Sequence, residues 1–164
     1  MSEFNIQAAT EDGVCHIRLT GRVTFTMSRR FDAFIEDVIK QTLSDIIIDL
    51  CKAEHIDSTI LGLLAKIARR FIAHHHRKPI LLSTSEDINI LLDNMGFEAA
   101  FDIRDSVDAV PFYLEDIPSL AKSVPMPETL LEAHSELMDL DERNVDRFKT
   151  TVETLRDAVK RESS

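Results

Sequence analysis

The chain has 164 residues and a formal net charge of −10, with 44% apolar and 29% charged residues. This balance is that of a globular domain of ordinary size and excludes an intrinsically disordered chain. Because nucleic acids and anionic membranes attract basic surfaces, the acidic charge argues against both as partners and favours contacts with other proteins.

The N-terminal end and the two cysteines indicate the compartment. Residues 1–5 are polar and acidic and lack the basic and apolar parts of a signal peptide. No apolar run approaches the roughly 20 residues of a membrane span. Cys15 and Cys51 do not form a CxxC pair, so we expect two buried strand thiols and no disulfide. These features predict a cytoplasmic protein.

The first half of the chain alternates strand and helix patterns. Residues 4–9 and 14–20 carry alternating apolar side chains around an Asp-Gly turn, which predicts two strands, the second ended by Gly21. Apolar residues within 27–43 recur every three or four positions, as in an amphipathic helix. Residues 45–50 (DIIIDL) are typical of a strand buried on both faces, and a polar loop is expected after them.

The alternation continues in the following segment. A long apolar helix is predicted over residues 58–75, a buried strand over 79–82 and a third helix over 86–95, with Gly96 at its end. One last short strand is expected at 101–103. Strands that alternate with helices predict an α/β fold with a largely parallel sheet.

A proline-containing segment separates this part from a helical tail. We expect a domain over residues 1–117, a linker over 118–127 and a helical extension over 128–164. Apolar tail residues alternate spacings of three and four, the seam of a coiled coil or helical hairpin, with a break near 139–141. Because the heptads are few, a fold-back or hairpin is favoured, while a homodimer through the tail stays open. The seam consists of Val145, Phe148, Val152, Leu155 and Val159.

The segment DLCKAEHIDSTILGLL, residues 49–64, places an acid and two hydroxyl residues where the long helix begins. Asp, Ser and Thr are the usual residues of a helix N-cap, so this composition alone is explained by capping. The segment also follows the carboxyl end of a central strand, which is where open α/β sheets bind ligands and partners. Capping and a functional hydroxyl are both consistent with these residues.

This segment resembles the signature of STAS domains, the family of anti-sigma factor antagonists. The segment LTGRVTF, residues 19–25, is similar to the family's glycine-bearing second strand and loop, and the element order agrees from about residue 4 to 110. The family often has Ser-Gly where this chain has Thr59 and Ile60, and the helical tail lies outside the resemblance. The resemblance implies a STAS-like mixed, largely parallel sheet with a C-terminal helical extension. The matching residues are Asp49, Leu50, Ile56, Asp57, Ser58, Gly62, Leu63 and Leu64.

The resemblance also implies a function without catalysis. In the family, the serine after the aspartate is phosphorylated by the anti-sigma factor, an ATP-binding serine kinase, and dephosphorylated by a PP2C-type phosphatase. By position the acceptor is Ser58, with Thr59 as the alternative, and phosphorylation would release the partner by adding charge to an acidic patch. The expected partner surface, with Ile60 and Leu61 exposed, comprises Gly21, Arg22, Thr24, Glu54, His55, Asp57, Thr59, Ile60 and Leu61.

Several alternatives remain open at this stage. Asp57 either steers the kinase or completes the cap, and Asp49 is more simply a carboxylate that bonds backbone amides than a functional one. No GxSxG, P-loop, GxGxxG or metal motif supports an enzyme, so no cofactor is expected. Three consecutive histidines, residues 74–76, point to different helix faces and suit a helix end better than a metal site, while His16 and His134 carry no signal. The competing function is a constitutive adaptor whose tail selects the partner.

Overall fold

The computed structural model describes residues 4–108, 110–111, 113–120 and 125–163. Its described strands form one mixed sheet in the order β5-β4-β3-β2-β1-β6. Strands β2 to β5 pair in parallel, and β1 pairs antiparallel with both β2 and β6, which confirms the largely parallel sheet. The strands are β1 (Asn5–Glu11), β2 (Val14–Val23), β3 (Asp45–Ile56), β4 (Ile80–Leu82), β5 (Asp102–Arg104) and β6 (Glu115–Asp116).

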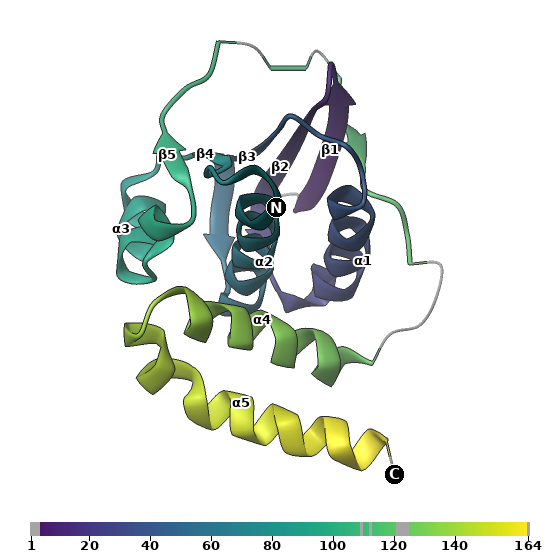
Figure 1. The fold of residues 1–164 in the computed structure, drawn as a ribbon, viewed down its shortest axis with the longest axis vertical. Helices are drawn as coiled ribbons and strands as arrows, with labels where there is room; N and C mark the ends of the chain where they lie inside the picture. The colour runs from purple at the N-terminus through teal and green to yellow at the C-terminus, as the bar shows by residue number, and fades with distance from the viewer. Residues whose placement is uncertain (1–3, 109, 112, 121–124, 164) are drawn as a thin grey trace.

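The main helices cover one face of this sheet. Figure 1 shows α1 (Ser28–Ile39) and α2 (Ser58–His75) side by side against it, and α3 (Glu86–Asn94) beside β5. Alternate residues of β3 point to opposite faces, so Ile48 joins the main core under the helices while Ile47 packs with a small cluster on the other face. Burial on both faces of DIIIDL is therefore confirmed. Short 3-10 helices precede α1 and follow α3, at Phe25–Met27 and Phe97–Ala99.

Strands β2 and β3 are both longer than expected. Strand β2 continues past Gly21, which sits at φ +73 beside a register shift, instead of ending there. Strand β3 runs to Ile56, so the expected loop is strand. The two segments pair directly, with Gly21 opposite Ala53 and Arg22 opposite His55. Parallel pairing satisfies the backbone of these polar residues and leaves their side chains free to face solvent.

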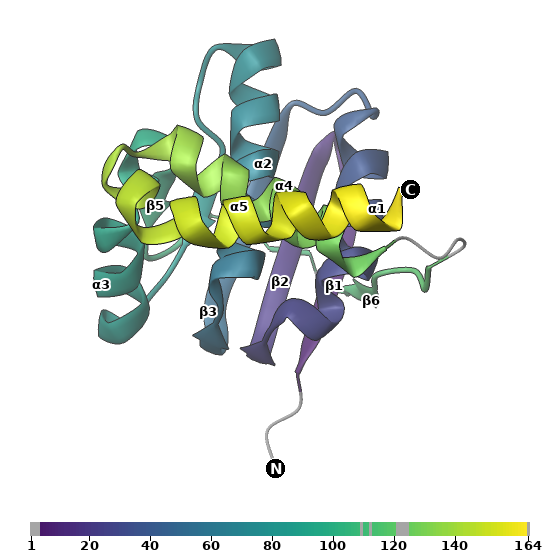
Figure 2. The same ribbon diagram turned by 90° about the horizontal axis from the view of Figure 1, so that it is seen from below.

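The tail forms a helical hairpin that folds back onto the domain, as favoured from the sequence. Helix α4 (Met126–Leu140) packs across α2, and α5 (Arg143–Glu162) lies on the outer side of α4, as Figures 1 and 2 show. The break falls after Leu140, next to the expected position. Helix α4 begins two residues before the expected extension, and residues 121–124 of the expected linker lie outside the described residues.

The described helices include none that is both long and apolar enough to cross a lipid bilayer. The cysteine expectation is half right, because Cys15 is buried and Cys51 is exposed, and both are free thiols. Cys51 lies in the polar extension of β3, where the strand continues beyond its buried part.

Candidate functional site

Asp57, not Ser58, is the N-cap of α2. One carboxylate oxygen of Asp57 accepts a hydrogen bond from the Ile60 amide at 3.0 Å, and the other accepts one from the Phe25 amide at 2.7 Å. Asp57 thus satisfies a free amide of the helix start and ties that start to the segment after β2. Capping therefore explains Asp57 and leaves the Ser58 hydroxyl without a capping role.

The Ser58 hydroxyl is instead held by the tail. It lies 3.0 Å from Nε2 of His134, and Nδ1 of the same ring lies 2.7 Å from the Leu130 carbonyl oxygen. Because a carbonyl oxygen only accepts, Nδ1 carries the proton and Nε2 accepts from the Ser58 hydroxyl. His134 is 6% exposed and contacts the Phe148 ring edge-on, at 5.4 Å between centroids. The hairpin therefore partly covers the predicted acceptor, which is half-buried.

The expected partner surface divides into an exposed part and a buried part. Arg22, Glu54 and His55 are exposed around the start of α2, and Thr24 is half-buried and hydrogen-bonded to Thr26 at 3.1 Å. Gly21 contributes backbone only. The expectation that Ile60 and Leu61 are exposed is wrong, since they are 0% and 1% exposed, and Thr59 is 4% exposed. Helix α2 lies between the sheet and α4, so its first turns are covered on both sides.

Asp49 has a structural role on the sheet face opposite the helices. Its carboxylate accepts hydrogen bonds from the Arg18 guanidinium at 3.1 Å and from the Cys51 amide at 2.9 Å. Bonding of a backbone amide is the role favoured from the sequence. Partial burial and the neighbouring Asp49 carboxylate raise the pKa of the Cys51 thiol, so this cysteine is not an activated nucleophile.

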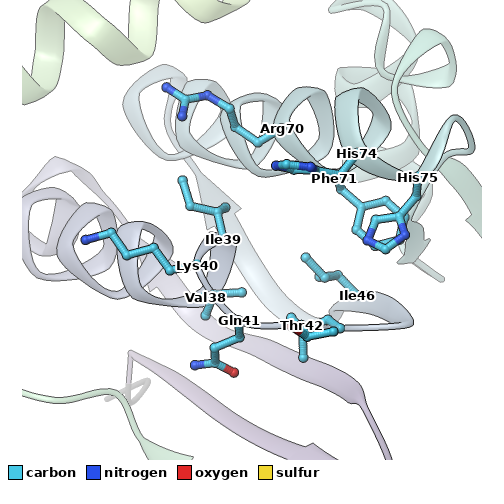
Figure 3. Close-up of a pocket in the computed structure, with 11 residues that line it drawn as sticks. Val38, Ile39, Lys40, Gln41, Thr42, Ile46, Arg70, Phe71, His74 and His75 are labelled. Atoms are coloured by element: carbon cyan, nitrogen blue, oxygen red, sulfur yellow. The ribbon is translucent and has the colours of Figure 1, made fainter.

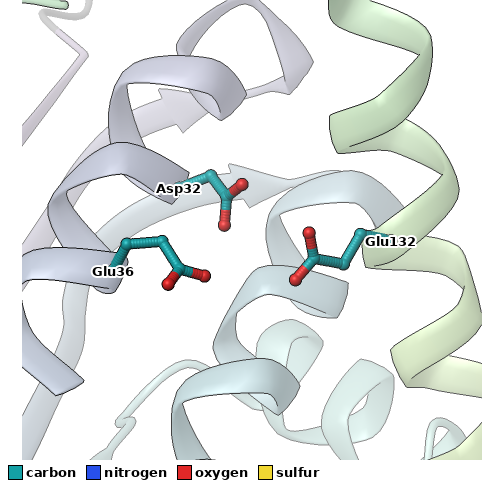
Figure 4. Close-up of side chains that lie close together, drawn as sticks. All are labelled: Asp32, Glu36 and Glu132. Atoms are coloured by element: carbon teal, nitrogen blue, oxygen red, sulfur yellow. The ribbon is translucent and has the colours of Figure 1, made fainter. Parts of the chain in front are cut away.

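A buried ion-pair cluster fastens α4 to α1 and α2. The Lys66 side chain is fully buried, and its Nζ lies 2.7 Å from Asp32, 2.5 Å from Glu36 and 2.5 Å from Glu132. Figure 4 shows the three carboxylates pointing toward one another from α1 and α4. Their spacing alone would suit a cation, but the ammonium group already bonds all three, so the cluster is structural.

The pKa values in this cluster follow from burial and pairing. Burial by itself lowers the pKa of the Lys66 ammonium, but hydrogen bonds to Asp32, Glu132 and Glu36 outweigh burial, so the pKa is raised. Burial raises the pKa of Asp32, whereas the hydrogen bond from Lys66 lowers that of Glu36. Lys66 therefore stays charged, and one lysine holds together three groups that would otherwise repel one another.

Helix α4 approaches the α2 backbone more closely than side chains normally allow. A Cβ atom built on Gly62 would lie 2.0 Å from the Ala133 carbonyl oxygen, so only glycine fits under α4 at this crossing. Further along α2, Arg69 pairs with Glu136 and, at 3.4 Å, with Asp139. The hairpin thus contacts α2 from Ser58 to Arg69, over about three turns.

The turn of the hairpin closes the C-terminal end of α3. The last carbonyls of a helix lack partners within the helix and carry partial negative charge, which suits donors and cations. Three side chains from the start of α5 supply donors to the last carbonyls of α3. Gly96, at φ +79, takes the chain out of α3. Arg143, Asn144 and Arg147 donate to the carbonyl oxygens of Asp93 at 3.2 Å, Met95 at 3.0 Å and Asn94 at 2.7 Å.

We predict that Asp141 stabilises the protein only above strongly acidic pH. Hydrogen bonds from the Arg143 side chain and amide lower the pKa of Asp141 to about 2, from an ordinary 3.8. A carboxyl with a lowered pKa in the folded state contributes stability above its unfolded value and loses it as the pH falls. The urea midpoint of Asp141→Asn should lie below that of the wild type at pH 6, and the two should converge between pH 4 and pH 2. A difference that persists unchanged at pH 2 would contradict this assignment.

A pocket of about 370 Å³ lies at the other end of α1 and α2 and is separate from Ser58. Figure 3 shows Lys40, Arg70, His74 and His75 around its rim. Because α2 rises about 1.5 Å per residue, the histidines at its end are about 25 Å from Ser58. His76, at φ +55, ends the helix, and His75 stacks on Phe71 at 4.2 Å, so these histidines serve as a helix end, as expected.

Sequence reasoning missed two residues of this site, His134 and Lys66. Lys66 is the one charged residue in the apolar run 59–68. A single charged residue in a helix that is apolar on all faces indicates a buried ion pair. Its partners lie on two other helices, so their identity needs the fold. His134 interrupts the apolar seam of the tail, but nothing in the sequence connects it with Ser58.

The comparison with family models identifies the domain. Residues 5–110 match the model of the STAS domain, so the chain belongs to the STAS family. This match covers β1 to β5 and α1 to α3 and excludes β6 and the hairpin.

Solved structures with the same fold include anti-sigma factor antagonists. One is an anti-sigma factor antagonist from Mycobacterium paratuberculosis, with 16% identity, a TM-score of 0.57 and coverage of 65% of this chain and 89% of that one. The antagonist SpoIIAA in its unphosphorylated form has 21% identity and a TM-score of 0.52, covering 65% and 91%. The Bacillus cell fate determinant SpoIIAA in the phosphorylated form gives the same identity and TM-score, covering 65% and 93%. No curated protein matches the sequence significantly.

Proposed function

We propose that this chain is a cytoplasmic anti-sigma factor antagonist that switches partners through Ser58. Unphosphorylated, it binds an anti-sigma factor that is also an ATP-dependent serine kinase, and phosphorylated on Ser58 it releases that partner. The observation that carries the proposal is the Ser58 hydroxyl itself, which opens α2 of a STAS domain while Asp57 does the capping. Exposed Arg22, Glu54 and His55 surround this position and supply partner contacts.

The covalent step is an ordinary phosphoryl transfer from ATP. The Ser58 oxygen forms a bond to the γ-phosphorus, the bond from that phosphorus to the β–γ bridging oxygen breaks, and ADP leaves. The hydroxyl proton passes to a base on the kinase. A PP2C-type phosphatase reverses the switch by hydrolysis, in which water restores the hydroxyl and releases inorganic phosphate.

The position of Ser58 suits a switch that changes binding rather than the fold of the STAS domain itself. A phosphate adds about −1.5 to −2 charges at neutral pH, and at a helix N-terminus this charge meets free amides and the positive end of the helix dipole. SpoIIAA has been solved in both the phosphorylated and unphosphorylated forms, and each matches this chain with a TM-score of 0.52. The added charge therefore acts mainly on a partner surface that already contains Glu54 and Asp57.

The proposal predicts that charge at position 58 abolishes partner capture. The wild type and Ser58→Ala should both retain an ATP-binding kinase from an extract of the source organism, whereas Ser58→Asp should retain it at least about tenfold less well. Ser106→Asp is the matched control, because Ser106 is exposed and lies outside the α2 region. Captured proteins are identified and quantified by mass spectrometry.

The outcomes of this experiment separate the proposal from its alternatives. Equal capture by all variants would overturn the switch and favour a constitutive adaptor. Incubation with the co-purifying kinase and ATP, followed by intact-mass analysis, tests the acceptor, and a phosphate mapped to Thr59, which is 4% exposed here, would move the site. Ester or nucleotide turnover that disappears in Ser58→Ala would favour an enzyme. The structure does not complete a Ser-His-Asp triad at Ser58, because His134 Nδ1 bonds the Leu130 carbonyl oxygen rather than a carboxylate.

A further inference from the structure

The contact between the hairpin and the domain combines apolar and polar groups. The buried residues of α4 are Thr129, Ala133, His134 and Leu137. Ala133 and Leu137 belong to the main core, and Leu140 and Phe148 pack against it. The polar contacts include the Lys66 cluster, the Arg69 pairs and the Ser58–His134 hydrogen bond, and water can hydrate these groups when α4 leaves.

One group in this contact is imperfectly satisfied. The Thr129 hydroxyl is buried, with the residue 2% exposed, and has no hydrogen-bond partner among the described residues. An unmet buried hydroxyl weakens the docked state, because water would bond it once α4 separates. This hydroxyl is therefore one group that favours release of the hairpin.

A phosphate on Ser58 does not fit beneath the docked hairpin. The Ser58 oxygen already lies 3.0 Å from His134 Nε2, and the backbone of α4 lies against Gly62 one turn further on. A phosphoryl group added to this oxygen needs the space that the imidazole fills. A kinase also needs to reach the hydroxyl, which is half-buried by its own chain.

We propose that the α2 face from Ser58 to Arg69 is an interaction surface whose resident occupant is the α4–α5 hairpin. The docked hairpin masks Ser58, and only the form with the hairpin displaced is phosphorylated or binds the partner. This inference rests on the proposed function for the identity of the acceptor. It adds a third state, unphosphorylated and masked, to the two states of the switch.

Gly62→Ala is the variant that should open the hairpin. Its new Cβ would meet the Ala133 backbone, which can move only if α4 does, whereas alanine is the better residue for α2 once α4 has left. Amide hydrogen exchange measured by mass spectrometry should be at least about tenfold faster in α4 and α5 than in the wild type, with β2 and β3 unchanged. Glu136→Lys, which repels Arg69, should act in the same direction, and Glu153→Lys on the exposed face of α5 should not.

Thr129→Val should close the hairpin more tightly. Valine has nearly the same shape and removes the unbonded hydroxyl, so exchange in α4 and α5 should become several-fold slower. Thr151→Val is the matched control, because Thr151 is exposed on α5 and should leave the exchange unchanged. Variants that shift the same equilibrium in opposite directions separate hairpin opening from general loss of stability.

Access to position 58 can be measured without knowing the kinase. A Ser58→Cys substitution combined with Cys51→Ser leaves Cys15 as the only other thiol, and Cys15 is 1% exposed with a pKa raised by burial. The measured quantity is the rate at which the thiol at position 58 reacts with a maleimide, divided by its thiolate fraction read at 240 nm. Gly62→Ala should raise this rate and Thr129→Val should lower it, each by the same factor as the exchange of α4.

Each outcome of these measurements has a definite meaning. The mask is overturned if hairpin amides exchange only through global unfolding, or if faster exchange leaves the thiol rate unchanged. If the protein with Ser58→Cys and Cys51→Ser is a dimer whose thiol rate rises on dilution, the hairpin docks on a second copy, against the intramolecular form proposed. Incubation with ATP and extract should phosphorylate Ser58 faster in Gly62→Ala than in the wild type. No phosphate on Ser58 in either protein would refute the proposed function while the masking results stand.

Discussion

Replacing Lys66 with methionine is expected to lower the free energy of unfolding by about 2–3 kcal/mol, because it removes the buried cation that three partly buried carboxylates share. Asp32, Glu36 and Glu132 offer oxygens within 4.8 Å of one another, and Lys66 is the group that bonds all three. The loss is measured by urea denaturation at pH 7. Lys149→Met is the control: Lys149 is exposed and 3.7 Å from Asp146, so its loss should change stability by less than about 0.5 kcal/mol.

The pH dependence of Lys66→Met identifies the cause. Without the lysine, mutual repulsion raises the pKa of these carboxyl groups above their unfolded values, so they bind protons more readily in the folded state. Protonation of these carboxyl groups should therefore restore stability to the variant. The difference in free energy of unfolding between the variant and the wild type should narrow as the pH falls from 7 to 4. A gap that is constant over this range would indicate a packing defect rather than unpaired charge.

Gly96→Ala is expected to have the second-largest effect, by detaching the turn of the hairpin from α3. Gly96 sits at φ +79, a backbone conformation that costs an alanine roughly 1–2 kcal/mol. Its Cβ would also lie 2.2 Å from an Asp141 carboxylate oxygen, so the side chain that pairs with Arg143 has to move. Gly96→Ala should therefore lower the free energy of unfolding. Combined with Ser58→Cys, it should also speed the reaction of that thiol with a maleimide.

Gly13→Ala is the matched control for this prediction. Gly13 has nearly the same backbone conformation, at φ +80, and its Cβ would lie 3.2 Å from the Ser44 side chain, far from the hairpin. Both variants bear the cost of the left-handed backbone, and only Gly96→Ala disturbs Asp141. If both variants accelerate labelling at position 58 equally, the turn of the hairpin does not control access to Ser58.

The proposed masking of Ser58 would change how a STAS domain can be regulated. In a domain without such a cover, the state of Ser58 alone would decide binding. Here the Ser58 hydroxyl, the close approach at Gly62 and the buried Lys66 all lie in one contact between α2 and α4. Under the proposal, any factor that binds the hairpin would shift the balance between masked and open forms without touching Ser58, by the difference in its affinity for the two forms.

Local patterns determined most of the elements of this protein. The apolar periodicity of residues 58–75 and the β-branched run at 45–50 predicted helix α2 and the buried part of β3, because each pattern depends on near neighbours in the chain. The break between α4 and α5 followed from polar residues that interrupt the seam. The motif around Asp57 and Ser58 identified the STAS family, because cap, helix and glycine are close in sequence.

Strand ends were less predictable, because pairing rather than local composition decides them. Residues 51–56 are polar and look like a loop, yet they extend β3 because β2 offers a parallel neighbour through Gly21. Burial of Ile60 and Leu61 likewise depends on tertiary packing, because both belong to the main core that α2 forms with other elements.

The sequence by itself determined the family, the α/β elements and the candidate acceptor Ser58, since these depend on short-range spacing. Only the tertiary structure decided that Asp57 is the cap, that His134 holds the Ser58 hydroxyl and that Lys66 joins three helices. Those contacts join residues up to 76 positions apart, and no local pattern specifies which distant surfaces will pack together.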